Sequence, residues 1–456
     1  MVGRERAGES LNRLFSAHSV AVVGASRDPE KVGHIVLKSI LDGGFAGDVY
    51  PVNPKQKEIL GLRAYSSIGS VPGNVDLAVV AIPAPYVPDV LREAADKGVG
   101  GAVVLSGGFR EAGRADLEEQ LAEIVGSSGL RIVGPNCQGL NYLPNKLRAS
   151  FWFPPVMPGP VAVVSQSGTV AATLAGWAVD EGFGVSGTVC LGNQVDVSET
   201  DVIGFFADDP QTRAMAFYLE GAKDGRRFID VLKRVAPKKP VVILKSGRTA
   251  GGQRAAASHT KSLAGHDEIF GAVCRQFGAV RAPDLESLYD NAKALSTLAP
   301  LRGKRVLVIS SSGGAGILAV DEAERQGLIV PPLPPTVMEE LKGVDLPRNV
   351  VYGNPLDLTV CNASDFGVAL SVLNGYDVAD VYLAIFGDPI AGAADVVKAF
   401  ASSARAKVAV AFLGGGEVER MERPRMQAAG IPVFPTPRRA ARAIAAAMWW
   451  STRFAA

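Results

Sequence analysis

Short apolar runs that pass directly into a glycine- or serine-rich turn, and then into a helical pattern, occur three times along the chain. They are SVAVVGAS at residues 19–26, PVAVVSQSG at residues 160–168 and KRVLVISSSGGAG at residues 304–316. Continuous valine and isoleucine runs are typical of buried parallel strands, and strand–turn–helix units begin doubly wound sheets. The pattern therefore predicts an α/β protein of three doubly wound domains.

Two proline- and glycine-containing stretches separate these domains, FPPVMPGP at residues 153–160 and LAPLRGK at residues 298–304. We therefore expect domains at residues 1–153, 154–299 and 300–456. Further apolar runs that we expect to be strands are DVYPVNP, VDLAVVAIPAP, GAVVLSGGF and LRIVGPN in the first domain, GVSGTVCLGN, AMAFYLEG and PVVILKSG in the second, and DVYLAIFG, KVAVAFLGG and IPVFPTP in the third.

Composition narrows the class of protein. The chain has 456 residues, 51 glycines, a hydrophobic fraction of 47% and a formal net charge of +1. This balance gives no electrostatic reason to expect nucleic acid or membrane binding. The four cysteines are far apart and show no metal-ligand spacing, and no apolar signal segment opens the chain. We expect a cytoplasmic protein with reduced thiols and no metal site of its own.

The first turn contains Gly24, Ala25 and Ser26 but lacks the GxGxxG pattern of nicotinamide-binding domains. The second strand ends in Asn53 and Lys55 rather than in an acidic residue that would hold ribose hydroxyls. A lysine there suits a phosphorylated ribose, as in NADP or in the 3′-phosphate of coenzyme A. A structural turn without a ligand is the alternative interpretation.

Later strand ends of the first domain add residues at the carboxyl edge of the predicted sheet, where open α/β sheets bind ligands. The candidates for cofactor binding at this edge are Pro83, Pro85, Ser106, Gly107, Asn136 and Cys137.

The second turn, SQSGT, places small residues at the start of a predicted helix. Backbone N–H groups and the helix dipole favour an anion at such a position, with Ser165, Ser167, Gly168 and Thr169 as the lining. A nucleophilic serine is disfavoured, because the glycine of a GxSxG turn is missing before Ser167. The third turn, SSSGGAG, has similar chemistry without a Walker ending, and close packing of helix on strand is its alternative interpretation.

The stretch KSGRTAGGQRAAASHTKSLAGHD at residues 245–267 follows an apolar strand, and its composition predicts a long mobile loop over anionic ligands. His259 within it is a candidate nucleophile for a phosphoryl group, flanked by Ser258. Glu220, at the end of AMAFYLEG, is expected to reach the same sheet edge and to hold one imidazole nitrogen. A backbone-bonded loop histidine and an exposed or salt-bridged strand-end carboxylate are the structural alternatives.

Together the segments SHTKSLAGHDE, YLEGAKDGRRF, LGNQVDVSETD, VVSQSGT, VGPNCQGLN and NPLDLT resemble the α subunit of ADP-forming acyl-CoA synthetases, which are relatives of succinyl-CoA synthetase. The resemblance extends over about residues 14–447. It implies a Rossmann-like CoA-binding domain followed by two flavodoxin-like domains, with His259 as the phosphohistidine and Glu220 as the carboxylate that steadies it. It also implies that SQSGT holds the phosphohistidine, that Asn193 lies beside it, and that Asn136 and Cys137 receive the thioester end of CoA.

The reaction implied by this resemblance converts acyl-CoA, phosphate and ADP into the free acid, CoA and ATP, through an acyl phosphate and the phosphohistidine. ADP or ATP with Mg²⁺ would bind a separately encoded ATP-grasp β subunit, which makes the active protein a hetero-oligomer. The family's SHTG motif reads SHTK here, with Lys261 in place of glycine. A non-catalytic CoA- or acyl-CoA-binding homologue, with a regulatory role, is therefore the alternative, and a NAD(P)-dependent oxidoreductase is disfavoured.

Overall fold

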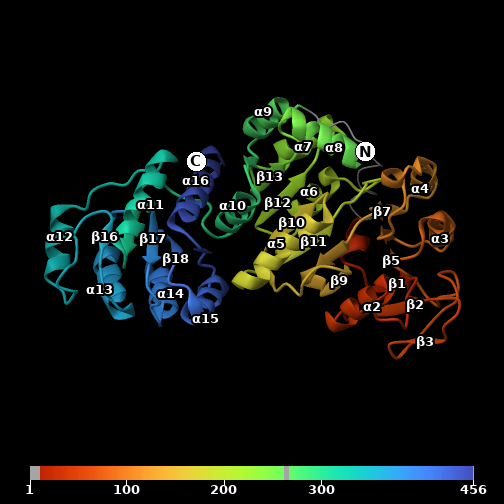
Figure 1. Cartoon of the computed structure of the whole chain (residues 1–456), viewed down its shortest axis with the longest axis horizontal. Coiled ribbons are helices and arrows are strands. Elements are labelled where there is room, and N and C mark those ends of the chain that lie inside the picture. Colours follow the sequence, from red (N-terminus) through yellow and green to blue (C-terminus); the bar gives the residue numbers. More distant parts are fainter. Residues whose placement is uncertain (1–10, 261–265, 455–456) are drawn as a thin grey trace. The chain divides into compact units, whose positions relative to one another are not determined.

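The structure, a computed structural model, describes residues 11–260 and 266–454, and for residues 256–260 it describes the backbone alone. Two compact units are present (Figure 1). Unit 1 comprises residues 1–179, 185–239 and 243–277, and unit 2 comprises residues 180–184, 240–242 and 278–456. Three main sheets, of five, seven and five strands, confirm the predicted α/β class.

The first sheet has the strand order β2-β1-β5-β6-β7 and is parallel throughout. Helix α2 covers one face, and α3 and α4 pack together on the other (Figure 1). The bounds are β1 (Ser19–Val23), α2 (Val32–Asp42), β2 (Asp48–Val52), β5 (Leu77–Val80), η1 (Ala84–Tyr86), α3 (Val87–Asp96), β6 (Gly101–Val104), η2 (Arg110–Ala112), α4 (Ala115–Ser128) and β7 (Arg131–Val133), with a small hairpin of β3 (Glu58–Ile59) and β4 (Leu62–Arg63). The five predicted strands of this domain are therefore confirmed.

The second sheet has the order β14-β13-β12-β10-β11-β8-β9. Its centre, β13 to β11, contains the predicted strands, and β10 pairs in parallel with both β11 and β12, whereas the antiparallel hairpin β8–β9 was not predicted. The bounds are β8 (Gly139–Tyr142), η3 (Leu143–Asn145), β9 (Leu147–Ser150), β10 (Pro158–Ser165), α5 (Gly168–Glu181), β11 (Val185–Cys190), α6 (Glu199–Asp208), β12 (Ala214–Leu219), α7 (Gly225–Val235), β13 (Val241–Lys245), α8 (Ala250–Thr260), α9 (Asp267–Phe277) and β14 (Val280–Arg281). The hairpin precedes the predicted boundary at residue 153 and extends the second sheet, because β8 pairs with β11.

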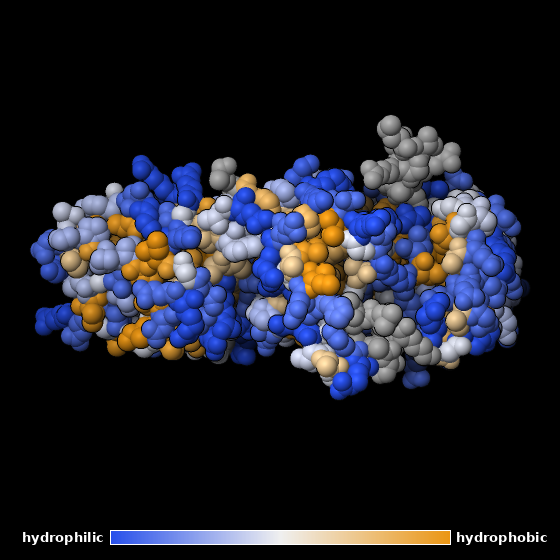
Figure 2. Space-filling model, turned by 90° about the horizontal axis from the view of Figure 1, so that it is seen from above, coloured by the Kyte–Doolittle hydropathy of each residue, from blue (hydrophilic) through white to orange (hydrophobic). Residues whose placement is uncertain are grey.

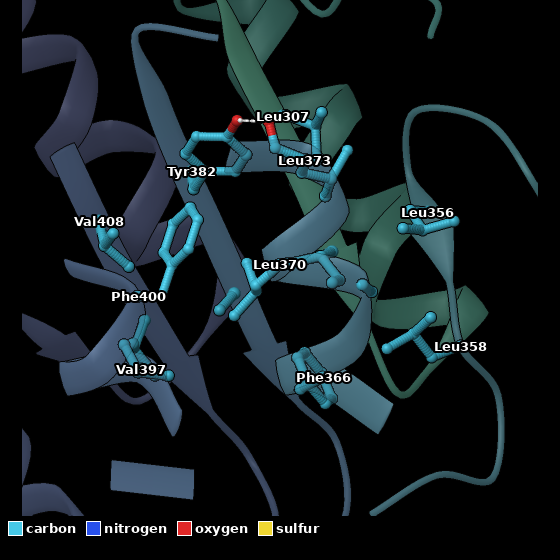
Figure 3. Packing of buried hydrophobic residues seen from close by; sticks show 14 of the residues in the cluster. Leu307, Leu356, Leu358, Phe366, Leu370, Leu373, Tyr382, Val397, Phe400 and Val408 are labelled. Carbon is cyan, nitrogen blue, oxygen red and sulfur yellow. Dashed lines mark hydrogen bonds between the residues drawn. The ribbon is translucent and has the colours of Figure 1, made fainter. Parts of the chain in front are cut away.

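The third sheet has the order β16-β15-β17-β18-β19 and is parallel. Figure 3 shows one of its faces, where phenylalanine and leucine side chains such as Phe366 and Leu370 of α13 belong to the same buried cluster as Tyr382 and Leu307 of the sheet. The bounds are α10 (Leu285–Thr297), β15 (Val306–Ser310), α11 (Gly313–Arg325), α12 (Pro335–Lys342), β16 (Leu356–Asp357), α13 (Ala363–Asn374), β17 (Val381–Phe386), α14 (Ala393–Ser403), β18 (Lys407–Phe412), α15 (Gly416–Ala428), β19 (Val433–Phe434) and α16 (Pro437–Phe454).

The segment expected to be a long loop is largely helical. After β13 only residues 246–249 lie outside regular structure, and then helix α8 begins at Ala250 and runs through the candidate His259 to Thr260. The long-loop prediction is therefore wrong for residues 250–260. Alanine and glutamine favour helix and tolerate the two glycines at its start, and this outweighs the glycine signal that suggested a loop. Lys261 lies outside the described residues.

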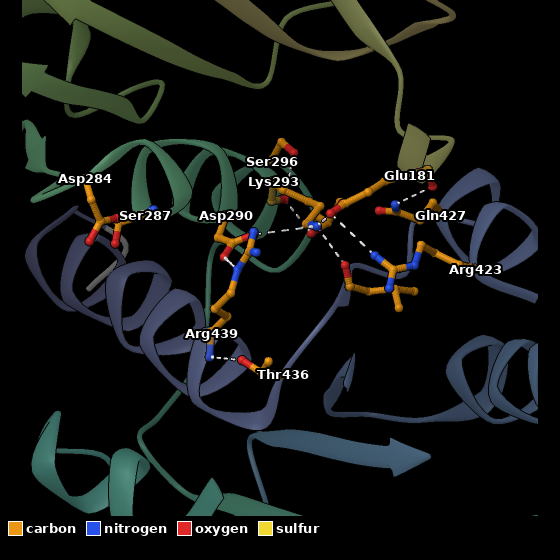
Figure 4. Close-up of polar contacts among 12 residues, drawn as sticks. Glu181, Asp284, Ser287, Asp290, Lys293, Ser296, Arg423, Gln427, Thr436 and Arg439 are labelled. Carbon is orange, nitrogen blue, oxygen red and sulfur yellow. Dashed lines mark hydrogen bonds and ion pairs between the residues drawn. The ribbon is translucent and has the colours of Figure 1, made fainter. Parts of the chain in front are cut away.

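Unit 2 contains a buried charged cluster (Figure 4). The Lys293 side chain is fully buried; its ammonium lies 2.6 Å from the carboxylate of Glu181 and donates a 2.7 Å hydrogen bond to the Val433 carbonyl. Arg439 binds Asp290 through two hydrogen bonds of 2.6 and 3.0 Å, and Lys293 lies 3.7 Å from the same carboxylate. Each buried charge thus has an opposite partner, the condition under which buried ions are tolerated.

The surface offers no single large apolar area on the face seen in Figure 2, where hydrophilic residues predominate and hydrophobic ones form separate small groups outside the grey residues. Scattered apolar groups of this kind are normal for a folded chain. Among the described helices, none is both long and apolar enough to cross a membrane.

Candidate active site

A cavity of about 790 Å³ opens at the carboxyl edge of the first sheet. It brings together most of the residues predicted to bind the cofactor, namely Gly24, Ser26, Asn53, Lys55, Pro83, Ser106 and Gly107. Sequence reasoning missed Lys31, Gly33 and Phe151, which also line it. Lys31 directly precedes helix α2, so a second ammonium and a helix N-terminus face the same cavity as Lys55. This combination suits a phosphorylated ligand.

Local geometry explains why the first turn needs its glycine. Gly24 has a φ of +89°, and a Cβ added there would lie 2.3 Å from the Ala81 carbonyl oxygen. Asn53 then joins the two strand ends, because its Nδ2 donates to the Ala25 carbonyl at 2.7 Å and its Oδ1 accepts from the Lys55 backbone at 2.8 Å. The amide of Asn53 therefore shapes the cavity wall through the backbone.

The other predicted cofactor residues lie outside the cavity lining. Ala25 is buried, and Pro85 is exposed in η1. Asn136 is exposed, with its backbone N–H bonded to the Ser106 carbonyl. Cys137 is buried, its thiol donates to the Val104 carbonyl at 3.3 Å, and burial raises its pKa well above the usual value. A direct role for this thiol finds no support in its surroundings.

The SQSGT turn joins β10 to helix α5. The Ser165 hydroxyl is buried and donates to the Ser167 carbonyl at 2.6 Å, while the Ser167 backbone N–H donates back to it at 3.0 Å. The Ser167 and Thr169 hydroxyls lie 3.3 Å apart at the helix start. A Cβ at Gly168 would come within 2.5–2.7 Å of the Gln138 side chain, which packs against this helix terminus. The turn thus presents small groups and backbone donors, as an anion site requires.

Gln166, in the middle of this turn, is the residue that sequence reasoning missed most clearly. Its Oε1 accepts from the backbone N–H groups of Glu220 and Gly221, and its Nε2 donates to the Gly221 carbonyl at 2.9 Å. The same Nε2 donates to Gln194 Oε1 at 2.9 Å. Gln166 therefore connects the end of β10 to the end of β12, which carries Glu220.

Asn193, predicted to lie beside the phosphate, is held by the first domain. Its Nδ2 donates to Glu111 at 2.6 Å and to Glu118 at 3.0 Å, and its Oδ1 accepts from Asn136 at 3.3 Å. Burial would raise the pKa of Glu111, but the hydrogen bonds from Asn193 and from the backbone of Gly108 and Phe109 outweigh burial and lower it. Both amide protons of Asn193 are thus engaged, and its contact with phosphate stays a prediction.

The two sheets of unit 1 meet along backbone segments. The N–H groups of Asn193, Val195 and Val197 donate to the carbonyls of Pro135, Gly134 and Ile132 at 2.9, 2.9 and 3.0 Å. Arg131 and Asp196 form a 2.8 Å ion pair at the same junction. Because Pro135 and Asn136 follow the first sheet while Asn193 and Gln194 follow the second, this junction fixes the candidate CoA edge against the candidate phosphate edge.

Glu220 lies half-buried directly after β12, at the carboxyl edge of the second sheet as predicted. Ser258 and His259 fall in the last described turn of α8, and their side chains lie outside the description. The carboxylate–imidazole contact therefore stays a prediction. No group of three or more histidine, cysteine or acidic side chains able to hold a metal ion occurs in the described part of the chain.

Comparison with known proteins adds family evidence. The family model "CoA binding domain" matches residues 18–142, and "Succinyl-CoA ligase like flavodoxin domain" matches residues 158–295. The chain is 39% identical to the alpha subunit of acetate–CoA ligase [ADP-forming] I from Pyrococcus furiosus, over 97% of this chain and 98% of that one.

Longer and solved relatives agree. Acetate–CoA ligase [ADP-forming] I of Archaeoglobus fulgidus is 38% identical over 95% of this chain, which spans 63% of that protein. The dinucleotide-forming acetyl-coenzyme A synthetase 1 of Ca. Korarchaeum cryptofilum, solved with phosphate and ADP, superposes with a TM-score of 0.90 at 36% identity, covering 98% of this chain and 97% of that one. This chain therefore belongs to the family of ADP-forming acyl-CoA synthetases related to succinyl-CoA ligase, which are acid–thiol ligases.

Proposed function

We propose that this chain is the α subunit of an ADP-forming acyl-CoA synthetase and that it carries the acyl-transfer half of the reaction. The observation that supports this most is the junction within unit 1, which joins the cavity with Lys31 and Lys55 to the SQSGT turn through paired backbone at residues 132–136 and 193–197. A phosphorylated carrier and a free phosphate thereby have neighbouring binding surfaces on one rigid scaffold.

The first step is the attack of phosphate on the thioester carbon of acyl-CoA. The new C–O bond gives an acyl phosphate, the C–S bond breaks, and the CoA thiolate takes up the proton that hydrogen phosphate releases. In the second step an imidazole nitrogen of His259 forms a bond to phosphorus, the bond from phosphorus to the acyl oxygen breaks, and the carboxylate leaves. Both steps need positioning and charge neutralisation, which the α5 N-terminus and its backbone donors supply.

Glu220 is assigned the role of holding the second imidazole nitrogen, so that the first is free to attack. Its place after β12, tied to Gln166, supports this assignment. The SQSGT turn, with Ser165, Ser167, Gly168 and Thr169, is assigned to the phosphoryl group. Coenzyme A is assigned to the cavity lined by Gly24, Lys55 and Ser106.

The second half of the reaction is assigned to a partner. Relatives named as alpha subunits imply a separate subunit. We assign to it an ATP-grasp fold, ADP or ATP with Mg²⁺, and the transfer of the phosphoryl group from His259 to the nucleotide. The active protein is then a hetero-oligomer.

Labelling of the isolated chain tests this function without the partner. Incubation with acetyl-CoA and ³²P-labelled phosphate should give label that is lost in acid and retained in base, because a phosphorus–nitrogen bond has that stability. His259→Ala should remove the label, whereas His266→Ala, whose exposed histidine follows seven residues later, should retain it. Equal label in the wild type and His259→Ala would contradict the assignment of His259, whereas CoA binding without label from any short acyl-CoA would favour the non-catalytic homologue.

A further inference from the structure

Glu199 is a fully buried carboxylate that the proposed reaction does not use. It is the first residue of α6, and its side chain is 0% exposed. Burial raises its pKa, and hydrogen bonds from its own backbone N–H, from Gln194 and from Thr200 act in the opposite direction. Removal of a carboxylate from water costs free energy, so a fully buried carboxylate is expected to have a role in the surrounding structure.

Its partners form a chain of oriented amides. Gln194 Nε2 donates to Glu199 Oε2 at 3.1 Å, and Gln194 Oε1 accepts from Gln166 Nε2 at 2.9 Å. A carboxylate only accepts, so it forces the NH₂ end of Gln194 to face it. The oxygen of Gln194 must then face Gln166, and this turns the NH₂ end of Gln166 toward Gln194.

This series of hydrogen-bonded amides ends at the backbone of Glu220 and Gly221. With its NH₂ end fixed, Gln166 points Oε1 at the backbone N–H groups of Glu220 and Gly221, while its second amide proton reaches the Gly221 carbonyl at 2.9 Å. Gln166 thus binds this short segment from both its donor and its acceptor side. A rotated amide would place two donors against two N–H groups and release the segment.

Gln194, the middle residue of this series of amides, is held in a strained backbone conformation. Gln194 has a φ of +55°, in the left-handed region that non-glycine residues seldom adopt, and it is buried. The Lys223 ammonium donates to the Asn193 carbonyl at 3.0 Å and also to the Gln194 carbonyl. Burial lowers the pKa of Lys223, and the charges of Glu118 and Glu199 oppose that effect. Strain that is clamped in this way is typical of functional segments.

We propose that Glu199 is a positioning residue that acts through Gln194 and Gln166 to hold the Glu220 segment for phosphoryl transfer to and from His259. The proposal rests on the proposed function, since it assigns a task to the same site. Glu199 has no contact with substrate in this scheme. Its effect is on the geometry of the carboxylate that orients the imidazole.

Single-turnover labelling of His259 from acetyl-CoA and ³²P-phosphate tests the proposal. Glu199→Gln keeps the shape but can donate as well as accept, so it should slow labelling by roughly five- to thirty-fold while the phosphate concentration for half-maximal rate changes by less than about twofold. Gln166→Ala should slow labelling at least as much. Because the two act in series, the double variant should be no slower than Gln166→Ala alone.

Ser311→Ala is the matched control, because Ser311 occupies the corresponding position after β15 and its hydroxyl accepts from Gly387 at 2.9 Å. It should leave the labelling rate unchanged. If Glu199→Gln does not fold, Gln194→Met breaks the chain at its middle and takes its place. Independent, multiplicative losses in the double variant, or an unchanged rate in Glu199→Gln, would overturn the relay alone. A wild type that takes no label would overturn both proposals.

Discussion

The turns that follow β10 and β15 have the same pattern of hydrogen bonds but different neighbouring side chains. The Ser165 hydroxyl donates to the Ser167 carbonyl at 2.6 Å and accepts from the Ser167 N–H at 3.0 Å. In the same way, the Ser310 hydroxyl donates to the Ser312 carbonyl at 2.8 Å and accepts from the Ser312 N–H at 3.0 Å. The N–H group of the residue between the two serines donates to the neighbouring strand, from Gln166 to the Tyr218 carbonyl and from Ser311 to the Ile385 carbonyl, at 3.1 Å in both turns. The second and third sheets therefore each contain this turn, with the same hydrogen bonds.

What differs is the chemistry beside the turn. The position that holds Glu220 in the second domain is Gly387 in the third, and the long amide of Gln166 is replaced by the short hydroxyl of Ser311. At the start of α11, Ser312 caps the helix and Asp357 lies close enough that a Cβ on Gly313 would be 2.6 Å from its oxygen. A carboxylate of the chain itself thus lies where an anion would bind, which favours the packing interpretation of the third turn.

Unit 2, which includes the third sheet, instead uses charge for stability. Its cluster of Lys293, Glu181, Asp290 and Arg439 is buried among helices and takes no part in the proposed reaction (Figure 4). The comparison teaches that a phosphate-type turn becomes a site only when its neighbours supply the correct polar groups. It predicts that substitutions at the carboxyl edge of the second sheet change the labelling rate, whereas substitutions in the charged cluster of unit 2 change stability.

The largest effect is expected for Lys293→Met. Removal of the ammonium leaves Glu181 and Asp290 buried with fewer partners, so the free energy of unfolding should fall by about 3–5 kcal/mol. Denaturant unfolding measures this loss. The surface variant Lys342→Met, which breaks a 2.7 Å pair with the exposed Glu339, should change stability by less than about 0.5 kcal/mol. A labelling rate of the folded Lys293→Met protein far below that of the wild type would break the comparison.

The second-largest effect is expected for Glu220→Gln, and it should appear in the labelling rate rather than in stability. Loss of the negative charge that we propose to orient the imidazole should slow His259 labelling by about 100-fold or more, equivalent to roughly 2.7 kcal/mol. Asp388→Asn, two residues after the end of β17 in the third sheet, should leave the rate within about twofold of the wild type. Rapid-quench labelling with thermal unfolding as a check on folding measures both, and equal losses in the two variants would contradict the assignment.

The smallest effect concerns Cys361, which is half-buried and senses the charge of Asp357, the carboxylate beside the third turn. Burial, followed by the charges of Asp365, Asp388 and Asp357, raises its pKa to about 12. Only ~1 in 10,000 of such thiols is ionised at pH 8, so iodoacetamide should label it slowly. Asp388→Asn should lower the pKa and speed alkylation roughly two- to five-fold, as followed by mass spectrometry. A wild-type Cys361 that reacts as fast as free cysteine would show that neither burial nor the neighbouring carboxylates suppress its thiolate.

Much of the site was readable from the sequence because strand ends are local features. Continuous apolar runs located every central strand, and the residues after them, such as Ser106 and Glu220, had to lie at the carboxyl edge. The glycine content of residues 245–267 led to the wrong prediction of a long loop, because the helix propensity of the alanines prevails at residues 250–260. Gln166 and Glu199 gave no signal, since a glutamine in a turn and a glutamate at a helix start are ordinary residues by type.

The sequence by itself determined the domain class, the strand ends and the family, since hydrophobic period and short motifs are properties of neighbouring residues. Only the tertiary structure decided which strand ends face one another. The amide chain from Glu199 to Glu220 joins three segments through side chains, and the hold on Asn193 comes from Glu111 and Glu118 of another domain. Hydrogen-bond direction depends on the partner that folding supplies, and no local pattern records that partner.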